Sequence, residues 1–102
     1  MSEVILTEPA KLDMAEIRDH LLNKLFNPQA FENLKQAVIK AFSVLEAHPQ
    51  AFAECDDLRL RGFGYRKCVV GGYLFIYKIS EVDGNVYVVR FFHGSQNWAS
   101  YF

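Results

Sequence analysis

The segment 58–102 constrains the fold most, because it contains three strand-like runs separated by two tight-turn signals. The runs lie near 64–70, 73–80 and 86–92. Nearly all of their apolar residues are β-branched or aromatic, as strands prefer. Gly71-Gly72 suits a two-residue hairpin turn because glycine adopts positive φ without strain, and Asp83-Gly84-Asn85 is the second turn signal. The pattern predicts a sheet that contains three consecutive strands.

The first half of the chain predicts a short strand at 3–6 and then two helices. Thr7 or Glu8 caps the first helix, and Asn27-Pro28 is a start signal for the second. The second helix should end near Ala47, because a residue that precedes proline, here His48, disfavours the helical region. The apolar stripes are Met14, Ile17, Leu21 and Leu25 in the first helix, and Phe31, Leu34, Val38, Ala41 or Phe42, and Leu45 in the second. The short link between the helices predicts an antiparallel hairpin.

Alternation along the predicted strands makes both faces of the sheet apolar. In the last strand it groups Val86, Val88, Arg90 and Phe92 on one face, and Tyr87, Val89, Phe91 and His93 on the other. One face has to pack on the helical hairpin. Few elements remain to cover the other face, so we expect that face to be open for a partner molecule.

Charge is divided unevenly between the two halves. Residues 58–102 carry six Lys/Arg against two Asp/Glu, whereas residues 1–57 carry five Lys/Arg against ten Asp/Glu. The sheet-forming half is therefore basic, which predicts a sheet surface that meets an anionic partner.

Composition and length predict one globular domain spanning residues 1–102. Cys55 and Cys68 match no metal-binding or redox spacing, which predicts free thiols in a reducing cytoplasm. No apolar run is long enough for a membrane span, and no cofactor or metal motif is present. We expect a cytoplasmic protein without a cofactor.

Five stretches of the chain are, in order, PAKLDMAEI, NPQAFENL, HPQAF, GYRKCVVGGYLFIYKI and NVYVVRFFHGSQNW. Together they resemble the RelE/ParE superfamily of toxins from bacterial type II toxin–antitoxin systems. The resemblance covers essentially the whole chain, and the order and spacing of the stretches carry it. It implies an α+β fold in which an N-terminal helical hairpin packs on a small, mostly antiparallel twisted β-sheet. It also implies a cognate antitoxin protein as partner.

The superfamily divides by mechanism, so the resemblance implies either of two activities. RelE-like members bind the ribosome and cut mRNA, whereas ParE-like members bind DNA gyrase and are not enzymes. Arg66 aligns with a catalytic Lys or Arg of the nucleases. Cys68 and Leu74 stand where those nucleases place further cations, and Ser95-Gln96-Asn97 stands where many relatives carry two arginines and an aspartate. A degenerate toxin that retains only antitoxin binding is a third reading.

For RNA cleavage, the candidate catalytic residues are Arg66, Arg90 and His93. The two guanidinium groups suit a phosphate clamp, and the imidazole suits acid–base chemistry near neutral pH. The alternatives are an ion pair between Arg90 and an acid of the helical half, and a merely hydrogen-bonded histidine at a strand end. Arg59, Arg61 and Lys67 would widen an RNA-binding patch or form a solvated edge. Trp98 and Tyr101 would stack on bases or fold back on the core.

Overall fold

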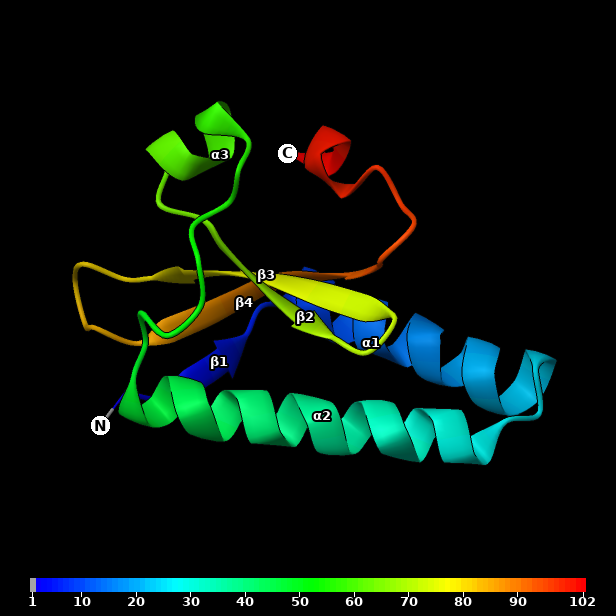
Figure 1. Ribbon diagram of the computed structural model, residues 1–102. Coiled ribbons are helices and arrows are strands. Elements are labelled where there is room, and N and C mark those ends of the chain that lie inside the picture. Colours follow the sequence, from blue (N-terminus) through cyan, green and yellow to red (C-terminus); the bar gives the residue numbers. More distant parts are fainter. Residues whose placement is uncertain (1) are drawn as a thin grey trace.

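The computed structural model describes residues 2–102 as a four-stranded sheet with long helices on one face and short helical turns on the other (Figure 1). The elements are β1 Val4–Leu6, α1 Glu8–Asp19, the π-helical turn η1 His20–Lys24, α2 Pro28–Ala47, α3 Leu58–Gly62, β2 Arg66–Val70, β3 Tyr73–Ile79, β4 Val86–His93 and the 3-10 turn η2 Trp98–Tyr101. This arrangement confirms the predicted α+β class with a helical hairpin on a mostly antiparallel sheet.

The strands lie in the order β1-β4-β3-β2. β2, β3 and β4 are joined by antiparallel hairpins, and β1 pairs in parallel with the first part of β4, from Val4 opposite Val86 to Leu6 opposite Val88. Gly71 has φ +64° in the β2–β3 turn, a value that favours glycine. Because β1 ends early, the second half of β4 has no strand on that side and lies beside α1 instead.

The helix boundaries follow from local signals in the sequence. The Thr7 side chain accepts a hydrogen bond from the Ala10 N–H at 3.4 Å, and Asn27 caps α2 through the Ala30 N–H at 3.0 Å. α2 ends at Ala47, as predicted. The α1 stripe is correct as far as Leu21, which is buried, but the prediction for Leu25 is wrong, because this residue is 55% exposed. The π-helical turn adds a residue to the helical repeat and rotates Leu25 away from the core.

The main core fills the space between the helices and the sheet, and we call it the helix-side core. Its buried members are Ala10, Leu21, Leu34, Val38, Ala41, Leu45, Cys68, Val70, Phe75, Tyr77, Val86, Val88 and Phe91. Phe42 meets Phe75 edge to face, with ring centroids 5.5 Å apart. The contact area between α2 and the sheet is therefore apolar across its width.

A β-bulge in β4 corrects the predicted face alternation. Arg90 lies opposite Ile76, but Val88 lies opposite Tyr77, so Val89 is an extra residue. Beyond the bulge the phase is reversed, and Phe91 joins Val88 in the helix-side core while Phe92 points to the other face. The prediction that placed Phe92 with Val88 is wrong for this reason.

The second face of the sheet is covered by the chain itself, so the prediction of an open apolar face is also wrong. Figure 1 shows α3 and the C-terminal turn standing on this side of the sheet, opposite α2. The opposite core contains buried Cys55, Leu60, Leu74, Ile76 and Phe92, with Tyr65, Val89, Trp98, Ala99 and Phe102 packed around them. The sequence predicts no element for Leu58–Gly62, so this cover is not among the expected features.

Candidate functional site

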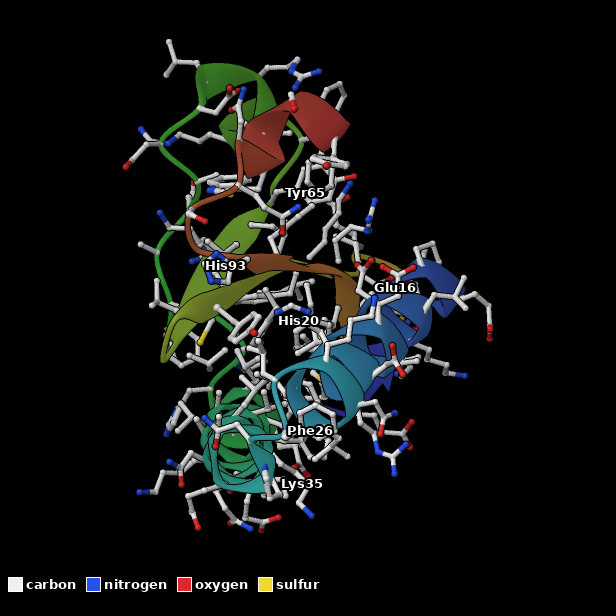
Figure 2. The ribbon with its side chains drawn as sticks, turned by 90° about the vertical axis from the view of Figure 1, so that its right-hand side faces the viewer. Glu16, His20, Phe26, Lys35, Tyr65 and His93 are labelled. Carbon is white, nitrogen blue, oxygen red and sulfur yellow. The ribbon has the colours of Figure 1, made fainter. Side chains whose placement is uncertain are left out.

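A groove runs between α1 and the free half of β4, and we call it the β4 groove. Its volume is about 390 Å³. It is lined by Asp13, Glu16, Ile17, His20, Tyr73, Arg90, Phe91, Phe92, His93, Gln96 and Tyr101. Figure 2 shows its two rims, with His93 at the end of β4 and Glu16 and His20 along the helix. The groove exists because β1 stops at Leu6 and leaves this edge of β4 to the helix.

Arg90 is held firmly on the wall of the β4 groove. Its Nε donates to Asp13 Oδ2 at 2.6 Å and its Nη2 donates to Asp13 Oδ1 at 3.0 Å. The guanidinium carbon lies 5.1 Å from the centroid of the Phe92 ring and 5.5 Å from the centroid of the Tyr101 ring. The hydrogen bonding of Arg90 to the Asp13 carboxylate, which accepts, raises the pKa of Arg90 above its usual value, so the guanidinium keeps its charge. The predicted alternative, an ion pair with an acid of the helical half, is confirmed.

His93 is an exposed residue at the end of β4. Its Nδ1 lies 2.6 Å from Ser95 Oγ and accepts a hydrogen bond from the Ser95 N–H at 3.2 Å. The His93 ring also packs edge to face on Tyr73, with ring centroids 5.2 Å apart. If Nδ1 accepts both bonds, the proton of the neutral ring is on Nε2. Nε2 is thus the ring nitrogen available to a ligand, and a role for His93 in acid–base chemistry stays a prediction.

Arg66 is not in the β4 groove. Its Nη1 donates to the Phe52 carbonyl at 2.8 Å, and its Nη2 lies 3.6 Å from Glu54 Oε1. It lines a second groove of about 790 Å³ between α3 and the β3–β4 turn, together with Arg61 and Lys78. The structure therefore brings Arg90 and His93 together and places Arg66 in a different groove.

The residues predicted to widen an RNA-binding patch are mostly engaged within the chain. Arg59 donates to the carbonyls of Phe102 at 2.6 Å and Ala99 at 3.1 Å. Arg61 donates to the Cys55 carbonyl at 3.1 Å and lies 3.8 Å from Asp56 Oδ1. These contacts fix α3 and η2 against each other and against the loop that precedes α3.

The remaining candidates for RNA binding are Lys67, Trp98 and Tyr101, and they lie on the side of the sheet that α3 and η2 cover. Lys67 Nζ lies 5.5 Å from the centroid of the Trp98 ring. Trp98 packs on the opposite core, which confirms the alternative that it folds back. Tyr101 is 55% exposed, and its ring contacts Phe92 at 5.2 Å. Any stacking of Tyr101 on a base stays a prediction.

Sequence reasoning did not identify Asp13, which accepts a third hydrogen bond from the Phe91 N–H at 3.0 Å. A weak signal was present, since Asp13 precedes Ile17 by four positions and so shares its helix face. Ser95 and Gln96, whose side chains bond His93, carried no signal. Within residues 2–102, no cluster of three or more His, Cys, Asp or Glu could hold a metal ion. No helix in the same range has the length and apolarity needed to cross a bilayer.

Comparison with solved structures finds the same fold in two toxin–antitoxin assemblies. The chain resembles the chromosomal ParDE toxin–antitoxin system from P. aeruginosa, with a TM-score of 0.68, 16% identity and coverage of 91% of this chain and 96% of that chain. It also resembles the RelBE2 toxin–antitoxin complex from Mycobacterium tuberculosis, with a TM-score of 0.62, 18% identity and coverage of 90% and 96%. At these identities the likeness concerns the fold alone.

A comparison with curated proteins finds no match. A family comparison does, because residues 4–98 match the family described as the ParE toxin of the type II toxin–antitoxin system, parDE. The match extends from β1 to the start of η2 and so includes both long helices, the whole sheet and every lining residue of the β4 groove except Tyr101. The chain therefore belongs to the ParE toxin family of type II toxin–antitoxin systems.

Proposed function

We propose that this toxin, when free of its antitoxin, inhibits growth by binding a target protein, and that the target is DNA gyrase. ParE-like toxins, which the sequence resembles, act in this way without being enzymes. One observation carries the choice of binding over RNA cleavage. The Arg90 guanidinium donates two hydrogen bonds to Asp13 and is flanked by two aromatic rings, so its charge is already compensated by a carboxylate and its plane is fixed in the groove wall.

The other candidate cations support the same choice. Arg66 and Arg61 both lie near Glu54, at 3.6 Å and 4.0 Å, so their charges are partly compensated. Arg66 also lines a different groove from His93. Cleavage of RNA needs a cation and an acid–base group around one phosphate. That convergence is missing for Arg66 and His93.

The first partner in this proposal is an antitoxin. Two solved structures that share this fold are described as a toxin–antitoxin system and a toxin–antitoxin complex. We expect the gene beside this one to encode that antitoxin. Expression of the toxin alone should arrest bacterial growth, and co-expression of the neighbouring gene should restore it. Normal growth with verified folded protein would contradict the proposal.

The target is tested with purified components and in cells. We expect the toxin to bind gyrase, to inhibit supercoiling and to increase cleaved DNA, while transcript ends remain unchanged after induction. Translation-dependent cuts in mRNA, with gyrase unaffected, would instead support the nuclease reading. A protein that binds its antitoxin but is inert in both assays would be a degenerate toxin.

A ribosome-dependent endoribonuclease is the second candidate, because Arg90, His93 and Tyr101 line one groove. In this reading the Nε2 atom of His93 transfers a proton and Arg90 shifts from Asp13 to the phosphate. His93→Gln would then abolish mRNA cuts and leave antitoxin binding intact. If gyrase is the target, the same variant should retain growth arrest unless His93 touches gyrase.

A further inference from the structure

The link between α1 and α2 carries three unusual features within a few residues. The end of α1 widens into the π-helical turn η1, and π-helical turns often mark functional positions. The turn is closed by the Leu25 N–H, which donates to the His20 carbonyl at 2.9 Å, and by the Asn27 N–H, which donates to the Leu21 carbonyl at 2.8 Å. These wide bonds direct Leu25 and Phe26 outward, and we call these two residues the tip pair.

The tip pair exposes apolar surface that the fold does not use. Leu25 is 55% exposed and Phe26 is 79% exposed. Among residues 2–102, the Phe26 ring takes part in no aromatic or cation–π pair, although many of the other aromatic rings do. The aromatic ring therefore adds little to the stability of the folded chain.

Phe26 is also strained. Its φ is +49°, and it is the one non-glycine residue of the described chain with a positive φ. Glycine or asparagine is the usual residue in this conformation just after a helix. A bulky aromatic residue there is uncommon, and strain of this kind is often found at functional sites. The exposed ring and the strained backbone of Phe26 both disfavour the folded state. We therefore expect this residue to have a role other than stabilising the fold.

The charge around the tip pair indicates what it meets. Residues 18–35 carry Arg18, Lys24 and Lys35 against Asp19 and Glu32, in a helical half that is otherwise acidic. Within the described chain Lys24 forms no ion pair, whereas Lys35 binds Glu32 at 3.0 Å. Figure 2 shows Phe26 and Lys35 on the helical side of the sheet, well apart from His93 and Tyr65 in that view.

We propose that the tip pair is a docking element that inserts into an apolar pocket with an acidic rim on the toxin's target protein. Aromatic anchors buried in a pocket commonly carry most of the energy of a protein interface, and rim charges mainly raise the association rate. A lipid surface fits less well, because two apolar side chains among mixed charges would bind a bilayer only weakly. This inference rests on the proposed function, in which the toxin acts by binding a protein.

The decisive variant is Phe26→Gly, because glycine relieves the positive φ and removes the anchor together. We expect its thermal midpoint to equal or exceed that of the wild type, while its affinity for purified gyrase falls about tenfold to a hundredfold and its growth arrest weakens. Phe26→Asn, which also tolerates this backbone conformation, serves as the second variant. Lys24→Glu should slow association severalfold and change dissociation little.

The matched control is Val82→Ser. Val82 is 97% exposed in the β3–β4 turn, at the end of the molecule opposite the tip pair (Figure 1), so its loss should leave gyrase affinity and growth arrest unchanged. If the wild type neither arrests growth nor binds gyrase, the proposed function and the docking role both fail. If the wild type is active and folded Phe26→Gly is equally active, the docking role alone is overturned. Binding to anionic vesicles that Phe26→Gly abolishes, with gyrase binding intact, would also overturn it.

Discussion

At the residue scale, the Asp13 carboxylate joins α1 to the half of β4 that no strand covers. It accepts two hydrogen bonds from Arg90 and one from the Phe91 N–H, and its side chain is only 12% exposed. Asp13→Asn would leave a partly buried guanidinium without its counter-charge. We expect the free energy of unfolding to fall by about 2–3 kcal/mol. Urea unfolding followed by circular dichroism measures this change.

The control for this prediction is Glu8→Gln on the same helix. Glu8 pairs with Lys11 at 3.2 Å, but the two side chains are 82% and 59% exposed. Exposed pairs of this kind contribute little, so the loss should stay below about 0.5 kcal/mol. If Asp13→Asn costs no more than Glu8→Gln, the ion pair does not hold α1 in place, and Arg90 is freer to meet a phosphate than we argue.

At the element scale, hydrophobic periodicity correctly predicts the elements whose backbone is regular. The stripe of α2 and its end at Ala47 follow directly from spacing and from Pro49. The errors at Leu25 and Phe92 share one physical cause, because an additional backbone residue, in the π-helical turn or in the β-bulge, changes the phase of everything after it. No residue type in either segment marks that insertion.

The cover on the second face of the sheet could not be predicted because its elements are too short to show a period. α3 has five residues and η2 has four. Their position depends on tertiary contacts, above all on the two bonds from Arg59 to carbonyls of the C-terminal segment. The same contacts explain why candidate RNA-binding residues are hard to predict from the sequence. Arg59 and Arg61 form hydrogen bonds to carbonyls within the chain, and the sequence does not show these partners.

Arg59→Ala should therefore release η2 without unfolding the sheet. Trp98 is the single tryptophan of the chain and packs near Phe92, with ring centroids 6.5 Å apart, so its fluorescence reports on this element. We expect a red shift of emission and faster amide exchange at Ser100 and Phe102, with a loss of about 1–2 kcal/mol in global stability. Arg59→Lys should behave in an intermediate way, because lysine lacks the planar fork. Unchanged fluorescence in Arg59→Ala would show that η2 is held by packing alone.

At the scale of the whole molecule, the sheet is sealed on both faces and most cations of the basic half are used internally. Arg61, Arg66 and Arg90 all meet acids from the first 57 residues, so the charge asymmetry along the sequence is largely an attraction between two halves of one fold. In the proposed function we therefore expect the antitoxin and the target to bind at edges, grooves and tips of the fold, since neither face of the sheet is open.

Cys68 lies in the helix-side core, where it is 2% exposed, and burial raises the pKa of its thiol to about 11. The folded state thus keeps its proton more tightly than the unfolded state does. The resulting stability is fully present below about pH 9 and is lost as the pH rises to about 11, amounting to about 2–3 kcal/mol from this group. Burial raises the pKa of Tyr77 as well, which extends the loss to higher pH.

Urea unfolding of the wild type and of Cys68→Ala at several pH values between 7 and about 11 separates the thiol from other groups. Cys68→Ala should lower stability near neutral pH because it removes buried atoms, yet its stability should decline less steeply above about pH 9. The comparison of slopes removes the contribution of Tyr77 and the lysines, since both proteins carry them. Equal slopes would mean that the Cys68 thiol ionises as readily in the folded chain as in the unfolded one, and that burial does not hold its proton.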